Sequence, residues 1–206
     1  MPAMMDYPLT LQHFLERAAK FFSRKEVVTK RAGSFDRYTY ADYCRRTGRL
    51  AHALKQLGVK PGDRVGTLAW NTSRHLELYF AVPCYGAVLH TLNLRLPPDQ
   101  LRYIINHAED RVIFVDASLA SILEQMRGDI PCVRHFVVMD DSGSAPTSLS
   151  PHVDYEDLLA AAPGDSFPWP RFDENTAAAM CYTSGDRKST RLNSSHIQKS
   201  RMPSSA

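Results

Sequence analysis

The sequence predicts an α/β fold in which helices cover a mainly parallel sheet. Short apolar runs alternate with longer stretches whose apolar residues recur at helical spacing, and only a few residues connect them. The alternating segments are strands at 64–69, 87–91, 112–115 and 136–139 and helices at 73–85, 98–108 and 117–126. With 206 residues, 44% of them hydrophobic, the chain is large enough to bury a sizeable core.

Two helices and a hairpin are predicted before the first of these strands. Thr10 is placed to cap a helix that ends near Ser23. The apolar stripe of that helix comprises Leu11, Phe14, Leu15, Ala18 and Phe22. A hairpin follows over 25–39, with its turn at 32–36, and Thr39 then caps a long amphipathic helix. Gly58 stands where that helix needs its C-terminal glycine.

The chain beyond residue 139 is predicted to be less regular. Residues 140–150 have the composition of a surface loop, 155–162 form a short helix, and the Pro-rich stretch 167–170 runs over the surface. Residues 176–182 rise into a strand that ends in Thr183-Ser184-Gly185. After Gly185 the helical and strand periodicity disappears, so 186–206 are predicted to be a disordered tail.

Charge and cysteine content exclude several classes of protein. The tail carries a net charge of +4 and residues 1–185 a net charge of −1, so the basic balance gives no support for nucleic-acid binding by the folded body. No apolar run approaches the roughly 18–20 residues of a membrane span, and the N-terminus lacks the pattern of a secretory signal. A soluble, intracellular protein is expected. The four cysteines have no zinc-ligand spacing and are predicted to be buried thiols.

Two segments at predicted strand ends are candidates for ligand binding. A strand that runs into Thr183-Ser184-Gly185 presents amides and hydroxyls suited to phosphate oxygens, although such a segment alone is usually only a turn. Trp70-Asn71 follows another strand at the edge where parallel sheets bind ligands; the simpler reading is an aromatic lid on the core with an Asn that caps a helix. The usual glycine-rich nucleotide motifs, a hydrolase nucleophile motif and paired metal-binding histidines are absent from the sequence.

The run from Leu68 to Leu96 resembles the adenylate-forming acyl-CoA synthetases, in particular the medium- and long-chain fatty-acid CoA ligases. The resemblance continues through Tyr103–Asp110 and reaches Met180–Gly185, and it covers nearly all of 6–185 in order. It implies that residues 1–185 are the N-terminal part of the large AMP-binding domain. It also implies a parent protein that activates a fatty acid with ATP and Mg²⁺ to an acyl-adenylate and passes the acyl group to coenzyme A.

The same resemblance assigns Thr183, Ser184 and Gly185 to the opening of the loop that wraps the ATP phosphates. The family pattern continues Thr-Thr-Gly-x-Pro-Lys-Gly, whereas this chain continues Asp186-Arg187-Lys188-Ser189. The later family elements are missing as well, including the adenine-binding segment, the magnesium-coordinating Glu and the catalytic Lys. No catalytic or metal-binding residue is therefore assigned, and ATP, Mg²⁺ and coenzyme A are not expected to bind this chain productively.

The tail, residues 186–206, resembles a translated sequencing adapter rather than a protein segment. Residues 186–196 and 200–206 can be back-translated, in order, into a common sequencing-library adapter that flanks a sample index. The hypothesis is that 186–206 are a non-native addition to a ligase sequence. By resemblance, the parent is expected to be cytoplasmic or loosely associated with a membrane, homodimeric as some relatives are, without a transmembrane segment and without a nucleic-acid partner.

Two other readings are consistent with parts of the sequence. A small non-catalytic protein would use its basic tail to bind nucleic acid or an acidic partner, although the tail lacks interleaved aromatic residues and a fold signature. An unrelated nucleotide-binding α/β domain would also show alternating strands and helices, and the missing glycine motifs count against it.

Overall fold

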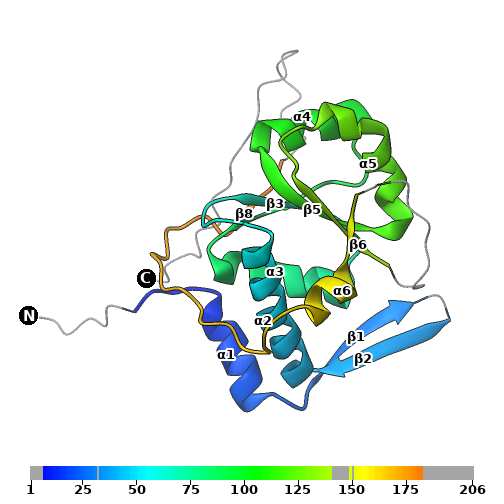
Figure 1. Cartoon of the computed structure of the whole chain (residues 1–206). Helices are drawn as coiled ribbons and strands as arrows, with labels where there is room; N and C mark the ends of the chain where they lie inside the picture. Colours follow the sequence, from blue (N-terminus) through cyan, green and yellow to red (C-terminus); the bar gives the residue numbers. More distant parts are fainter. Residues whose placement is uncertain (1–6, 32, 141–148, 150, 183–206) are drawn as a thin grey trace, which may run out of the picture.

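A six-stranded, entirely parallel sheet forms the centre of the molecule, which confirms the predicted α/β class. The structure is a computed structural model, and it describes residues 7–31, 33–140, 149 and 151–182. The strand order is β7-β6-β5-β3-β4-β8 (Figure 1). The strands are β3 (Arg64–Leu68), β4 (Val88–Thr91), β5 (Asp110–Asp116), β6 (His135–Met139), β7 (Val153–Asp154) and β8 (Ala179–Met180).

Helices cover both faces of this sheet, as Figure 1 shows. On one face lie α2 (Tyr40–Gln56), α3 (Ser73–Tyr85) and α6 (Tyr155–Ala160), and their apolar side chains share a core with Val65, Leu89 and Phe114. On the other face lie α4 (Pro98–Ala108) and α5 (Ala120–Met126), which pack on Ile113 and Val115. Two 3₁₀ turns, Ala117–Leu119 and Arg127–Asp129, flank α5. The alternation along each strand therefore divides its side chains between two cores.

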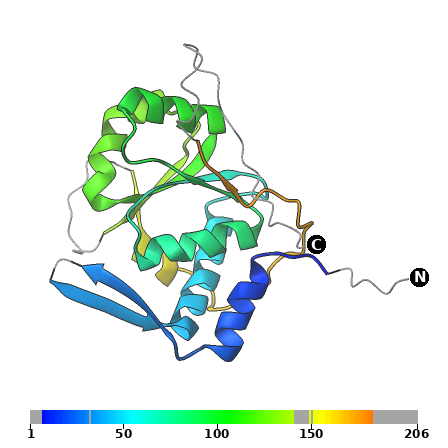
Figure 2. The same ribbon diagram turned by 180° about the vertical axis from the view of Figure 1, so that it is seen from behind.

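The N-terminal segment lies on the helical layer formed by α2 and α3. It contains α1 (Gln12–Phe21) and an antiparallel hairpin of β1 (Glu26–Arg31) and β2 (Ser34–Thr39), which extends from the body in both ribbon views (Figures 1 and 2). The prediction that Thr10 caps α1 is wrong, because Leu11 holds the N-cap position and no side chain caps the helix. The predicted stripe is also partly wrong: Leu15 is buried, but Phe14 and Phe22 are exposed.

The predicted start and end of α2 are confirmed in atomic detail. The Thr39 hydroxyl accepts a hydrogen bond from the Asp42 amide at 3.2 Å, and the Asp42 carboxylate accepts one from the Thr39 amide at 3.0 Å. This reciprocal capping box satisfies two donors that the first helical turn leaves free. At the other end Gly58 has a φ of 74°, a left-handed conformation that costs glycine little.

Several C-terminal expectations need correction. The strand predicted over 176–182 is reduced to the two residues of β8, which pair with β4. The Pro-rich stretch does not only run over the surface, since Phe167 and Trp169 are partly buried against the core that α2 and α3 share with the sheet. The predicted loop at 140–150 lies mostly outside the described residues. Within the described ranges, no helix combines the length and apolar character needed to cross a membrane.

We expect Thr39→Ala to lower the free energy of unfolding by about 1 kcal/mol, because it removes the capping hydroxyl of α2. Thr72→Ala is the matched control. Thr72 is the N-cap residue of α3, but its hydroxyl makes no capping bond and is buried without a partner, so its loss should leave stability unchanged or slightly raised. Urea unfolding followed by circular dichroism measures both variants; equal losses would contradict the assigned cap.

Candidate functional site at the carboxyl ends of the parallel strands

The turns that follow β3 and β5 are tied together at the carboxyl edge of the sheet. The Trp70 amide donates to the Asp116 carboxylate at 2.5 Å, and the Trp70 indole donates to the Ser118 hydroxyl at 3.1 Å. Burial raises the pKa of the Asp116 carboxyl, while the Trp70 amide and the charges of Arg74 and Arg31 oppose that rise. This corner is therefore a fixed polar joint at the edge where parallel sheets bind ligands.

The structure places Trp70-Asn71 on that edge, as predicted. It does not support the simpler interpretation, in which Trp70 covers the core and Asn71 caps a helix. Trp70 is 54% exposed, so it does not close the core as a lid. Asn71 does not cap α3, because Thr72 occupies the N-cap position. Instead, Asn71 borders a shallow hollow of about 310 Å³ that Thr29 of β1 and His75 of α3 also line. A ligand at Trp70-Asn71 stays a prediction.

The chain that leaves β8 is held by two histidines. The Tyr182 hydroxyl lies 2.5 Å from Nδ1 of His107 on α4, and the Tyr182 ring lies 5.2 Å from the His90 ring of β4, centroid to centroid. Tyr182 directly precedes the three residues that the sequence assigns to the phosphate loop. These contacts orient the last described residue before Thr183.

Beneath Tyr182 lies a buried pair that the sequence analysis missed. Nδ1 of His90 is 2.8 Å from Oδ2 of Asp110, and both side chains are fully buried. Burial raises the pKa of the Asp110 carboxyl, and the hydrogen bond and charge of His90 oppose that rise. The carboxylate reaches His90 across Gly66, where a Cβ would come within 3.0 Å of Oδ2. A His within an apolar strand was the one available signal, but nothing in the sequence pairs it with a residue 20 positions away.

A second buried carboxylate, Glu77 of α3, ties α3 to α2, α6 and strand β2 of the hairpin. It accepts hydrogen bonds from the Tyr155 hydroxyl at 2.6 Å, the Tyr38 hydroxyl at 3.0 Å and Arg46 Nε at 2.7 Å. Arg46 also binds both carboxylate oxygens of Glu156 at 2.9 Å. Burial raises the pKa of the Tyr38 and Tyr155 hydroxyls, and the nearby Glu77 adds to the rise, so both stay protonated donors. This network supports the fold rather than a reaction, because its polar groups are turned to one another.

The predicted phosphate-binding residues Thr183, Ser184 and Gly185 lie outside the described residues, as does the tail 186–206. In the described part of the chain, no cluster of three or more His, Cys, Asp or Glu side chains could hold a metal ion, so these residues do not provide a magnesium site by themselves. The prediction of buried thiols holds for Cys84 alone: Cys44 and Cys132 are half-buried and Cys181 is exposed, and all four are free thiols.

The fold and this edge define a class of protein: a parallel α/β domain with a polar joint after β3 and β5, at the edge where ligands bind. The family model described as "AMP-binding enzyme" matches residues 15–185. The chain belongs to the AMP-binding enzyme family.

Three relatives with similar sequences are CoA ligases. The chain is 48% identical over 183 residues to the long-chain-fatty-acid–CoA ligase of Thermus thermophilus, a match that covers 88% of this chain and 32% of the relative. It is 41% identical to the 3-methylmercaptopropionyl-CoA ligase of Ruegeria lacuscaerulensis and 40% identical to the medium-chain-fatty-acid–CoA ligase of Ectopseudomonas oleovorans, covering 88% of this chain and 34% of each relative. The chain therefore spans about a third of the length of these relatives.

A solved structure confirms the fold independently. The crystal structure of an anthranilate CoA ligase with anthranoyl-AMP superposes with a TM-score of 0.77 at 23% identity, over 87% of this chain and 33% of that protein.

Gly66→Ala should lower the free energy of unfolding by about 1–3 kcal/mol, because the new Cβ would lie 3.0 Å from both the Asp110 carboxylate and Ile113. The carboxylate cannot retreat without losing its bond to His90. Gly128→Ala is the control, since a Cβ there meets nothing within 4 Å and should leave stability unchanged or slightly raised. Chemical unfolding of both variants checks this, and equal stability would contradict the crossing of Asp110 over Gly66.

The ion pairs of Glu156 predict a loss of stability in acid. Burial alone would raise the pKa of Glu156, but hydrogen bonds from Arg46 and Arg74 outweigh it and hold the pKa below the usual 4.5. The unfolded chain then binds the proton more tightly, so the stabilisation is present above pH 4.5 and is lost as the pH falls through the folded-state value.

We measure the free energy of unfolding at several pH values from about 7 to 3. It should fall less steeply with decreasing pH for Glu156→Gln than for the unchanged chain. Glu16→Gln, at an exposed position of α1, is the control for a general charge effect. If the free energy of unfolding fell equally with pH in the unchanged chain and in Glu156→Gln, the ion pairs of Glu156 would not contribute to the loss of stability in acid.

Proposed function

We propose that the protein represented by residues 1–185 joins a fatty acid to coenzyme A with ATP, through an acyl-adenylate. The observation that carries the proposal is the match of 15–185 to the family model, together with three relatives that are CoA ligases at 40–48% identity. The long- and medium-chain ligases among them favour a fatty acid as the substrate. Because the chain spans only a third of these relatives, the activity belongs to the longer protein.

The proposed ligation has two steps, formation of the acyl-adenylate and transfer of the acyl group to coenzyme A. A carboxylate oxygen of the fatty acid attacks the α-phosphorus of ATP, and pyrophosphate leaves. The thiolate of coenzyme A then attacks the carbonyl carbon of the acyl-adenylate, and AMP leaves with the bonding electron pair. Magnesium, which accompanies ATP, supplies charge neutralisation on the phosphates. We assign Thr183, Ser184 and Gly185 to the phosphate oxygens, through hydroxyl and backbone N–H donors.

In this proposal the described residues position the loop rather than react. Tyr182, held by His107 and flanked by His90, sets the point from which the phosphate loop starts. Residues 1–185 are the N-terminal part of the AMP-binding domain, and 186–206 are a non-native addition. The chain as given then lacks the rest of the active site and is inactive by itself. We further propose a cytoplasmic, homodimeric parent that does not bind nucleic acid.

The first experiment is to sequence the gene from fresh source DNA across the codon of Gly185. We expect the reading frame to continue into Thr-Thr-Gly-x-Pro-Lys-Gly and a longer ligase. If Asp186-Arg187-Lys188-Ser189 is encoded in the source DNA, the non-native tail is refuted, and with it the proposal that this gene encodes an active ligase.

The second experiment measures fatty-acid-dependent exchange of pyrophosphate into ATP by the full-length protein. We expect Ser184→Ala to lower the exchange rate about 10²-fold to 10³-fold if its hydroxyl holds a phosphate oxygen in the transition state. Ser121→Ala, at an exposed position of α5, is the matched control and should be unaffected. Exchange that does not require a fatty acid, or that is unchanged in Ser184→Ala, would contradict the substrate class or the assigned loop, respectively.

A further inference from the structure

A buried pair of ionisable side chains lies beside the residue from which the chain leaves β8, and no step of the proposed reaction uses it. Nδ1 of His90, on β4, is 2.9 and 2.8 Å from the two carboxylate oxygens of Asp110, the first residue of β5. Neither side chain is exposed. Apolar side chains of similar volume often stabilise a fold as well as a buried ion pair does. Stability alone therefore does not explain the pair.

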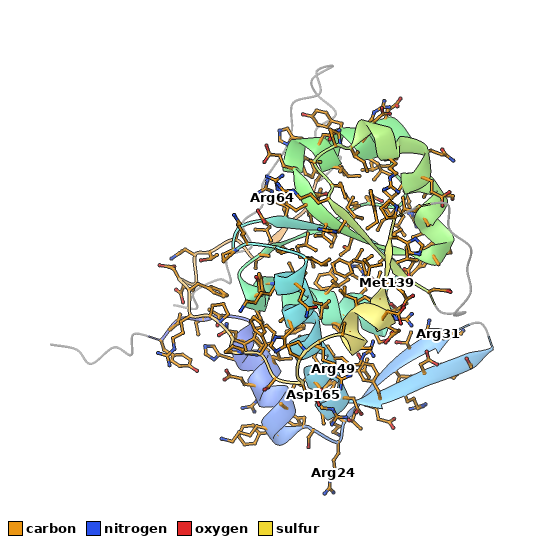
Figure 3. All side chains as sticks on the ribbon, viewed as in Figure 1. Arg24, Arg31, Arg49, Arg64, Met139 and Asp165 are labelled. Carbon is orange, nitrogen blue, oxygen red and sulfur yellow. The ribbon has the colours of Figure 1, made fainter. Side chains whose placement is uncertain are left out.

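Asp110 is held in place by the strand and the turn on either side of it. Its backbone pairs with Arg64 at the start of β3. The Arg64 guanidinium (Figure 3) donates to the Ala108 carbonyl and binds the Glu109 carboxylate at 2.9 Å, so it fixes the two residues before Asp110. Gly66 leaves room for the carboxylate to cross β3. Asp110 is therefore a fixed acceptor for His90.

The orientation of the His90 imidazole depends on Asp110. The second ring nitrogen, Nε2, is buried and has no hydrogen-bond partner in the part of the chain that the structure describes. A carboxylate at Nδ1 keeps a proton on that nitrogen and sets the orientation of the ring. Without Asp110, the ring would keep its packing but lose the hydrogen bonds that orient it.

The oriented imidazole packs against Tyr182. Their ring centroids are 5.2 Å apart, and the ring planes meet at 47°. The backbone gives this part of the chain little support, because β8 has two residues and pairs with Leu89 and His90 of β4. Burial first, and then the charge of Asp110, raise the pKa of the Tyr182 hydroxyl, which therefore stays protonated as the donor to His107. Contacts with two histidines thus set the Tyr182 side chain.

We propose that His90 and Asp110 are positioning residues for the formation of the acyl-adenylate. Asp110 orients the imidazole, and the imidazole fixes Tyr182, which directly precedes the residues assigned to the ATP phosphates. Neither side chain touches a substrate or transfers a proton. This inference rests on the proposed function, because it needs 183–185 to bind phosphate. A misplacement of about 1 Å in such donors can lower a rate about 10²-fold.

The test is fatty-acid-dependent exchange of pyrophosphate into ATP by the full-length protein, well below the melting temperature of each variant. His90→Asn keeps a donor toward Asp110 but removes the ring, and Asp110→Ala removes the acceptor. We expect each change to lower the exchange rate about 10-fold to 10²-fold and to leave the KM for the fatty acid unchanged. Asp110→Asn, which keeps an acceptor oxygen, should lose less than Asp110→Ala. If thermal melts show that Asp110→Ala does not fold, His90→Asn carries the test.

A double-mutant cycle with Tyr182→Ala separates positioning from a purely structural role. Tyr182→Ala should itself lower the exchange rate. His90→Asn should lower the rate little further in that background, because its effect passes through Tyr182. Tyr38→Phe is the matched control, since it removes a hydrogen bond to a different buried carboxylate, Glu77, and should leave the exchange rate unchanged.

The outcomes distinguish this inference from the proposed function. An undiminished rate in His90→Asn or in Tyr182→Ala would overturn the inference and leave the ligase proposal standing. So would a full further loss from His90→Asn in the Tyr182→Ala background, or an equal loss in Tyr38→Phe. If the unchanged full-length protein showed no fatty-acid-dependent exchange, the proposed function would fail, and this inference with it.

Discussion

The buried carboxylate of Glu77 is the constraint on which the helical layer depends. A charge in a dry interior is costly unless hydrogen bonds and an opposite charge surround it. Here the required partners come from β2, α2 and α6, through Tyr38, Arg46 and Tyr155. Each of these elements is therefore tied to α3 by a side-chain hydrogen bond to Glu77. The hairpin, which shares little core with the sheet, owes much of its placement to the Tyr38 bond.

Local features of the sequence predicted much of this architecture. The ends of α2 and α4 and the order of strands and helices follow from capping residues, from Pro98 at the first turn and from hydrophobic periodicity. The errors lie where tertiary contacts decide. A stripe of apolar residues at helical spacing predicted a buried face for α1. In the structure only Leu15 of that stripe is buried, while Phe14 and Phe22 are exposed. Thr10 does not cap α1 because the helix begins at Gln12, one residue later than a Thr10 cap requires.

The candidate site divides in the same way. The loop opening at Thr183 remains a prediction that rests on the family resemblance alone. The described contacts before it could not be predicted, because the His90–Asp110 pair and the Tyr182–His107 contact join residues 20 and 75 positions apart. Such pairs leave no periodic signal in a single sequence. Gly66 shows this most clearly: its lack of a side chain matters only because a carboxylate from another strand passes over it.

The position of β8 has a consequence for how the molecule assembles. Strands β3, β4 and β5 pair with near neighbours in the chain, whereas β8 must return across the intervening strands and helices to reach β4. Closing so long a loop delays a contact more than it weakens it. We therefore expect the sheet centre to form before the edge strand that leads to Tyr182 joins it. Tyr182 then makes its contacts with His90 and His107 only once β8 has paired with β4.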